Sequence, residues 1–383
     1  MQIGKLSGKF LYNGFKGGEM DYKDKYELEF EKEVEELKKN KPNLMLIGVS
    51  GAGKSSLINK IFGRNVAEVG TGLPITDRIE RYTSETSRIN IFDTLGYEVK
   101  GENQSQNTFE SKVVTEIERR ATLPLSEQIH IIWYCIPVTN HRIFSYDIDN
   151  INNLKQTGVP FFIAITKCDE DSLDENENGI TAEAFKKTLE KAGISRNLAF
   201  EVSSLPDLNL DLDDLINRSA NSLKDSNLKE AFIQAQLHNL SLKSDEAAKT
   251  IHLCSAAAVA VAANPLPVSD APAIIAIQMG MAIKLAKIYG FGAIGESATA
   301  LLKTQIVSMA AKQLAASLTK FVPIFGSVIN AAVAASFTEG LGWGLVTVYK
   351  NVLEEYLKTG KEPQWAMIFS SNILINILQN KYK

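Results

Sequence analysis

The chain has 383 residues, with 41 Lys and Arg against 45 Asp and Glu and a formal net charge of −4. This length exceeds what one hydrophobic core usually supports, so more than one domain is expected. The mildly acidic balance disfavours nucleic acid as a partner, since a phosphate backbone is bound by clustered Lys and Arg. The three cysteines show no metal-ligand spacing, and we interpret them as reduced thiols of a cytoplasmic protein.

An amphipathic helix over residues 21–40 is the first predicted element. Tyr26, Phe30, Val34 and Leu37 fall on one helical stripe, and Pro42 ends the pattern. We therefore expect residues 1–40 to form an N-terminal segment whose helix docks on another part of the chain.

A phosphate-binding loop follows, because Gly48-Val49-Ser50-Gly51-Ala52-Gly53-Lys54-Ser55 fits the pattern G-x-x-x-x-G-K-[ST]. An apolar run over 44–49 predicts the strand before it, and a helix is expected from Lys54 to the C-cap Gly63. Backbone N–H groups and Lys54 face the phosphates, and the Ser55 hydroxyl is a ligand for Mg²⁺. The predicted nucleotide-binding residues here are Gly48, Ser50, Gly51, Ala52, Gly53, Lys54, Ser55 and Ser56.

Further apolar runs predict a sheet built around this loop. They lie at 79–83, 88–92, 128–136, 160–165 and 198–200. The polar segment over 182–191 is predicted to form a helix. Apolar runs that alternate with amphipathic helices favour an α/β fold with a doubly wound, mostly parallel sheet. We assign residues 41–224 to this domain.

The stretch Thr166-Lys167-Cys168-Asp169 ends the strand over 160–165, and it indicates which purine base the nucleotide site binds. A carboxylate here accepts two hydrogen bonds, from the ring N–H and the exocyclic amine of guanine, and adenine offers no such pair. Asp169 is therefore the predicted base reader. Lys167 would lay its stem over the purine, and Thr166 would tie this loop to the phosphate loop. GTP and GDP are the expected ligands.

These residues give the chain a resemblance to the TRAFAC class of GTPases, whose fourth motif is [NT]-K-x-D. The stretch Asp93-Thr94-Leu95-Gly96 matches the third motif, D-x-x-G. The resemblance implies that Asp93 holds Mg²⁺ through water and that the Gly96 amide senses the γ-phosphate.

The same resemblance supplies the second and fifth motifs. Thr76 lies just before the strand over 79–83, as in Era-like GTPases, and is preferred to Thr71 as the switch threonine and magnesium ligand. With Lys54 and Gly96, Thr76 completes the expected catalytic set. Ser203 and Ser204 follow the strand over 198–200, where backbone amides would reach the guanine O6.

One position departs from the small signalling GTPases, which place a glutamine after D-x-x-G to orient the attacking water. This chain has Tyr97, and a phenol does not offer the paired donor and acceptor of an amide. We therefore expect slow intrinsic hydrolysis and a catalytic group from a cation or a partner. Arg78, Arg81 and Arg142 are the available cations, although a salt-bridged or solvated role is the more common one for a surface arginine.

After Lys224 the composition becomes alanine-rich, and residues 225–383 are expected to form an all-α domain that the N-terminal helix joins. The predicted helices are 228–263, 271–289, 297–320, 323–357 and 364–379. The runs 264–270, 278–281 and 288–290 resemble a helical domain of uncharacterised bacterial type that is appended to Era-like GTPases. The phosphate loop and the residues after it are similar to immunity-related GTPases as well, which join N-terminal and C-terminal helices into one domain.

The apolar helices leave two interpretations open. Residues 321–338 carry no charge but contain Pro, Gly, Ser and Asn, and residues 251–263 reach only about two-thirds of a ~30 Å hydrocarbon core. Lys284 and Lys287 interrupt the next helix, and Gly340 and Gly344 permit close helix contact in water or in lipid. We expect a soluble bundle with peripheral membrane contact, and membrane insertion is the alternative.

The sequence therefore predicts a Mg²⁺-dependent GTP-hydrolysing switch that acts on a helical domain. A small-molecule P-loop kinase would not need Asp169, so comparing GTP with ATP separates the two classes. A GTP-controlled self-assembling or membrane-remodelling protein of the immunity-related type fits the same motifs. A homodimer and a membrane surface are the candidate partners besides GTP and GDP.

Overall fold

The computed structural model describes residues 41–63, 73–76, 79–82, 89–94, 109–262, 270–290, 331–359 and 361. Several expectations fall elsewhere in the chain. The predicted helices over 21–40, 297–320 and 364–379 lie outside the described residues, as do Thr71, Arg78, Gly96 and Tyr97.

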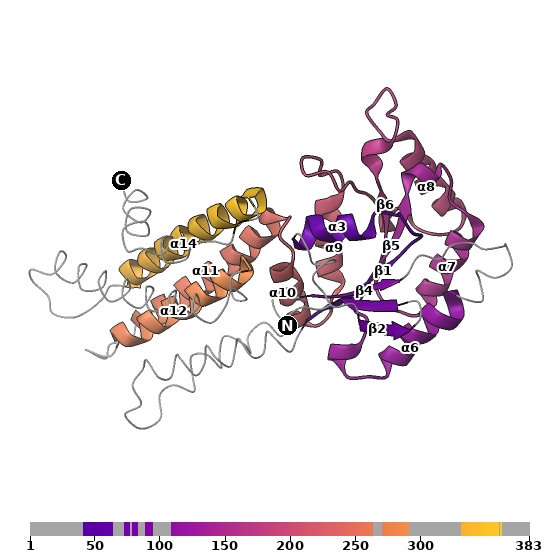
Figure 1. The fold of residues 1–383 in the computed structure, drawn as a ribbon. Coiled ribbons are helices and arrows are strands. Elements are labelled where there is room, and N and C mark those ends of the chain that lie inside the picture. Colours follow the sequence, from indigo (N-terminus) through magenta and orange to yellow (C-terminus); the bar gives the residue numbers. More distant parts are fainter. Residues whose placement is uncertain are drawn as a thin grey trace, which may run out of the picture.

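A seven-stranded sheet forms the first part of the molecule, in the order β2-β3-β4-β1-β5-β6-β7 (Figure 1). Strand β3 is antiparallel to β2 and β4, and every other neighbouring pair is parallel. The prediction of a mostly parallel, doubly wound sheet is thus confirmed. The strands are β1 Asn43–Ile47, β2 Leu73–Thr76, β3 Ile79–Tyr82, β4 Asn90–Thr94, β5 Ile131–Pro137, β6 Phe161–Thr166 and β7 Ala199–Glu201.

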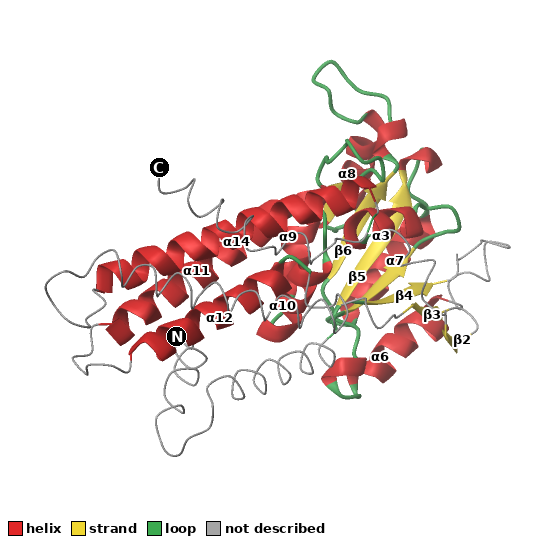
Figure 2. Cartoon of the chain, turned by 60° about the vertical axis from the view of Figure 1, so that its left-hand side comes forward, coloured by secondary structure: helices red, strands yellow, loops and turns green. Residues whose placement is uncertain are grey.

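Helices cover both faces of the sheet (Figure 2). Helices α3 Lys54–Phe62 and α9 Leu212–Ser222 pack on one face, where the Trp133 indole N–H donates to Ser219 Oγ at 2.9 Å. The other face carries the π-helical turn η1 Glu110–Val114 and the helices α6 Thr115–Ala121, α7 Ser145–Gln156 and α8 Ile180–Lys191. Short 3₁₀ turns are η2 Leu125–Glu127, η3 Val138–Asn140, η4 Cys168–Glu170 and η5 Arg196–Leu198.

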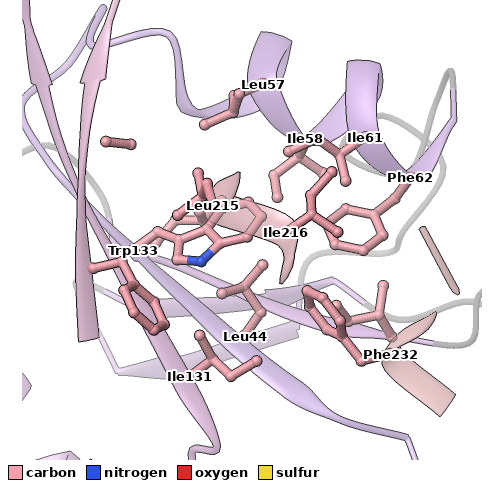
Figure 3. Close-up of a cluster of buried hydrophobic side chains, with 14 of the residues drawn as sticks. Leu44, Leu57, Ile58, Ile61, Phe62, Ile131, Trp133, Leu215, Ile216 and Phe232 are labelled. Atoms are coloured by element: carbon pink, nitrogen blue, oxygen red, sulfur yellow. The ribbon is translucent and has the colours of Figure 1, made fainter. Parts of the chain in front are cut away.

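Helix α10, Ser226–Ala235, belongs to the same hydrophobic core as α3 and the sheet. The rings of Phe62 and Phe232 meet edge to face with centroids 5.9 Å apart, and Phe62 stacks on Trp133 at 6.2 Å. Figure 3 shows these aromatic rings among the aliphatic side chains of α3, α9 and the strands. Aromatic pairs in such a cluster contribute about 0.5–1.5 kcal/mol beyond their buried area. The helical region is thereby anchored on the sheet domain.

Three long helices, α11 Leu240–Ala262, α12 Asp270–Ile288 and α14 Ala331–Thr359, form a second hydrophobic core. A Cβ added to Gly342 would lie 2.7 Å from Ile251 Cγ1, so a side chain at this contact between α11 and α14 would require Ile251 or the helices to shift. The sequence pattern predicted close helix contact at Gly340 and Gly344. In the structure, Gly342 is the glycine that contacts Ile251.

The expectation of one continuous helix over 228–263 was wrong. Helix α10 ends at Ala235 and α11 begins at Leu240, and Asn239 caps the new helix by accepting from the Leu242 amide at 2.8 Å. The Asn239 amide itself donates to Gln236 Oε1 at 2.8 Å. Side-chain amides that bond locally to the backbone compete with the helical pattern, which hydrophobic periodicity alone does not reveal.

None of the helices within the described ranges combines the length and the apolar character needed to cross a membrane. Part of the uncharged stretch over 321–338 lies outside those ranges.

Candidate nucleotide-binding site

The phosphate loop follows β1, whose neighbours β4 and β5 lie on opposite sides of it. A sheet opens a crevice at the carboxyl ends of its strands at such a switch point. A Cβ at Gly48 would lie 2.6 Å from the carbonyl oxygen of Cys135, so this position passes too close to β5 for a side chain. Gly51 and Gly53 adopt left-handed backbone angles, with φ of 75° and 81°. The loop's own geometry therefore requires the three glycines.

The Lys54 side chain folds back onto the phosphate loop and is almost fully buried. Its Nζ donates to the carbonyl oxygens of Gly48 at 2.9 Å and Val49 at 3.4 Å. The same atom is 3.7 Å from Asp93 Oδ1, an ion pair that is too long for a hydrogen bond. The ammonium group thus lies between the phosphate loop and the end of β4.

Ser55, Thr76 and Asp93 are the oxygen donors expected for magnesium, and all three belong to the described residues. Burial raises the pKa of Asp93 to about 6, against the opposing pull of Lys54. Its buried Oδ1 accepts no hydrogen bond from any described residue, and the Ser55 side chain is exposed at the start of α3. Carboxylate and hydroxyl oxygens are the donors that Mg²⁺ prefers, and an orphaned buried carboxylate oxygen fits such an ion. Thr76 is the last residue of β2.

The fourth and fifth motifs meet beside the phosphate loop. Thr166 Oγ1 donates to the carbonyl oxygen of Ala52 at 2.7 Å and thereby ties the two loops together. Lys167 has a left-handed φ of 59°, and its Cγ lies 4.0 Å from where a Cβ of Gly53 would be. The Ser203 hydroxyl donates to Asp169 Oδ1 at 2.6 Å. Ser203 is buried, whereas Asp169 and Ser204 are exposed.

Lys60, which lies in α3, was not predicted from the sequence. Its Nζ donates to the carbonyl oxygens of Ser203, Leu205 and Leu208 at 3.0, 2.7 and 2.6 Å. The first of these partners is 143 residues away in the sequence. Its partners are backbone carbonyls, which any residue carries, so no local pattern distinguishes Lys60 from a surface lysine.

The two described candidate cations have structural partners. Arg81 pairs with Glu127 at 3.4 Å and lies over the Phe92 ring at 5.5 Å. Arg142 lies over the Phe144 ring at 4.6 Å from the centroid. Cation–π contacts of this kind hold a guanidinium in place. The structure therefore brings the loop 48–55 together with Asp93, Thr166 and the pair Asp169 and Ser203, and the contacts of these two arginines lie with other residues.

Two parts of the chain match known families. Residues 43–167 match a family described as "50S ribosome-binding GTPase", and residues 226–352 match a domain of unknown function (DUF697). The first match contains the phosphate loop and Asp93.

Individual relatives are similar over part of their length. Translation initiation factor IF-2 of Fusobacterium nucleatum is 27% identical over 219 residues, which are 56% of this chain and 27% of that protein. The probable GTP-binding protein EngB of Cytophaga hutchinsonii is 29% identical over 136 residues, which are 35% of this chain and 65% of that protein. The chain thus spans less than two-thirds of the length of these relatives.

Two solved structures are similar to part of this chain at low sequence identity. A probable GTP-binding protein engB has a TM-score of 0.33 and 18% identity, over 47% of this chain and 97% of that chain. Era from Aquifex aeolicus bound to GDP·AlF4⁻ has a TM-score of 0.31 and 17% identity, over 48% of this chain and 57% of that chain.

A phosphate loop at the switch point of this sheet, together with the match over 43–167, defines a P-loop GTPase domain. The second match, over 226–352, covers α10, α11 and α12 and most of α14, so a helical region of that domain type follows the GTPase domain.

Proposed function

We propose that the chain is a GTP-dependent switch, which hydrolyses GTP slowly and passes the nucleotide state from α3 to its helical part. One contact carries the proposal: the Leu237 amide donates to the Ile61 carbonyl oxygen at 2.7 Å. Leu237 lies in the segment 236–239 that joins α10 to α11, and Ile61 lies in the last turn of α3. A helix that starts at the phosphate loop therefore ends against the entrance to the helical region.

The proposed coupling between α3 and the helical region continues through the buried side chain of Lys243. Lys243 Nζ donates to the carbonyl oxygens of Ile233 at 2.9 Å, Gln234 at 3.2 Å and Ile288 at 2.6 Å. One side chain thus joins the carboxyl ends of α10 and α12 to the start of α11. The carboxyl end of a helix carries unpaired carbonyls and partial negative charge, which an ammonium group stabilises. A displacement of α3 would reach all three helices through this junction.

The catalytic proposal assigns a role to each motif residue. Lys54 would neutralise phosphate charge, and Ser55, Thr76 and Asp93 would hold Mg²⁺. When bound, Mg²⁺ would stabilise the charge that develops on the phosphate oxygens. The Gly96 amide would sense the γ-phosphate, and Asp169 with the Ser203–Ser204 amides would bind guanine. Tyr97 would leave the attacking water poorly oriented, so the intrinsic rate would be slow.

Hydrogen exchange of the full chain tests the coupling. With a non-hydrolysable GTP analogue in place of GDP, the amides of 236–243 and 285–290 should change their protection, and those of α8 should serve as an internal reference. Lys54→Ala, which should lose hydrolysis and triphosphate affinity, is the control that should show no difference. Binding of both nucleotides with identical exchange at these amides would contradict the coupling.

Four measurements separate the alternatives. Calorimetry with GTP and ATP distinguishes the switch from a P-loop kinase, which would not prefer guanine. Light scattering with and without the analogue tests the homodimer and self-assembly. Sedimentation with anionic vesicles tests the peripheral membrane contact, and carbonate extraction distinguishes that contact from insertion.

A further inference from the structure

We propose that Lys60 is a positioning residue for guanine recognition, because its ammonium group holds the loop 203–208 in the form that presents backbone amides to the base. This inference rests on the proposed function and adds a determinant of base specificity to it. No sequence motif of the site includes Lys60.

The contacts of Lys60 saturate its ammonium group. A lysine has three N–H donors, and the carbonyl oxygens of Ser203, Leu205 and Leu208 lie within 3.0 Å of Nζ. Hydrogen bonds to a charged donor are stronger than neutral ones, so three of them restrain a short loop firmly. Burial lowers the pKa of Lys60, while Asp169, Asp213 and Asp207 oppose this effect. The Lys60 ammonium group thus interacts with Asp169, the base-reading carboxylate.

The direction of the Ser203 carbonyl decides where the next amide points. A trans peptide group is planar, with its C=O and N–H on opposite sides. Since the Ser203 carbonyl faces Lys60, the Ser204 N–H points away from Lys60. Within the described part of the chain, this N–H donates to no backbone carbonyl, and the Leu205 amide donates to Ser203 Oγ at 3.0 Å. An available donor next to Asp169 is what the guanine O6 requires.

Lys60 also joins the two ends of the nucleotide site. It lies in α3, the helix that Lys54 begins at the phosphate loop, and its partners follow β7 on the far side of β6. The Ser203 hydroxyl in turn holds Asp169. One side chain therefore fixes the distance between the helix that binds phosphate and the loop that binds guanine.

A neighbouring lysine provides a matched control. Lys186 lies 15 residues before Glu201 in the sequence, and it pairs with the carboxylates of Glu201 at 2.7 Å and Asp211 at 3.6 Å. It is more buried than a typical surface lysine and lies close to the same strand end. It donates to none of the loop carbonyls that Lys60 holds. Lys186→Met therefore removes a comparable charge without releasing the Ser203 carbonyl.

Calorimetry on the full chain tests the proposal with GDP, ADP and pyrophosphate as probes. Lys60→Met should raise the Kd for GDP on the order of tenfold and reduce the preference for GDP over ADP. Pyrophosphate binding should stay at the parent value, because the phosphate loop is intact. Lys60→Arg should restore most of the preference, and Lys60→Gln, which keeps two donors, should lie between. Lys186→Met should keep the parent preference.

Two results would overturn the inference alone. One is a Lys60→Met protein with the parent preference for GDP over ADP. The other is an equal loss of GDP, ADP and pyrophosphate binding, which would indicate general damage to the fold rather than a misplaced loop. A parent that binds GDP no better than ADP would overturn the proposed function, and this inference with it.

Discussion

The two regions of the molecule place their buried charges in opposite settings. In the sheet domain, the buried Lys54 lies 3.7 Å from Asp93 Oδ1 and beside the phosphate loop, part of which is exposed. In the helical region, Lys243 has no exposed surface and its ammonium is enclosed by helix carbonyls. The first arrangement leaves charge for binding, and the second uses charge to hold helices together. Burial of a lysine therefore indicates a site only where its neighbours leave an opening.

The largest expected effect is at Asp169, the proposed base reader. Asp169→Asn should replace an acceptor with an amide and mismatch both guanine donors, which can weaken binding by factors of roughly 10⁴. Xanthosine triphosphate should gain affinity, because its carbonyl accepts from the new amide. Titration calorimetry with both nucleotides measures the exchange.

Asp171 is the matched control for this change. It follows Asp169 by two residues but accepts from the amides of Thr181 and Ala182 at the start of α8. Asp171→Asn should therefore keep GTP affinity. Unchanged GTP binding in Asp169→Asn would remove the guanine assignment and weaken the contrast between a ligand-binding and a purely structural region.

Lys243→Met should have the next largest effect, and it should act on stability. Three carbonyl oxygens would lose a charged donor inside a packed junction, so we expect a loss of about 2–4 kcal/mol in the free energy of unfolding. A urea titration followed by helical signal measures it, and GDP affinity should stay within about twofold. Lys249→Met removes an exposed charge of the same helix and should be neutral.

Lys60 and Lys243 show how much of the fold and the site the sequence could predict. The motifs at strand ends located the phosphate loop, Asp93 and Asp169, because their chemistry depends on residues that are adjacent in the chain. The roles of Lys60 and Lys243 depend on backbone carbonyls that are distant in sequence, or on another helix, so no spacing marks them. The break between α10 and α11 was not predicted for a related reason. It depends on local hydrogen bonds of the Asn239 and Gln236 side chains, which do not change the hydrophobic periodicity.

A smaller effect is expected at the crossing of α11 and α14. In Gly342→Ala the new Cβ would lie 2.7 Å from Ile251 Cγ1, so the helices must separate or Ile251 must change its rotamer. We expect about 1–3 kcal/mol of destabilisation, measured by the same urea titration. Ile251→Ala removes the clashing atom, so the double variant should lose less stability than the sum of the two single changes. Strict additivity would show that the two residues do not meet.

The smallest expected effect is a pH dependence that belongs to the sheet domain. His130 Nδ1 accepts from the Asn43 amide at 2.8 Å, and Nε2 lies 2.8 Å from the Leu125 carbonyl oxygen, so the ring is held neutral with its proton on Nε2. Burial lowers the pKa of His130, while the Leu125 carbonyl and Asp225 oppose this effect. The unfolded chain therefore takes up the proton first as the pH falls below about 6.5, and folding stability should decrease from there.

His130→Gln tests this dependence, because an amide can accept from Asn43 and donate to Leu125 without titrating. Melting temperatures between pH 7.5 and 5.5 should fall more steeply for the parent than for this variant. His252, exposed in the helical region and paired with Glu339 at 3.1 Å, is the control. His252→Gln should keep the parent's slope, because the side chain lies exposed on the surface of the helical region, away from the buried contacts of His130. Equal slopes for the parent and His130→Gln would place the acid sensitivity elsewhere in the fold.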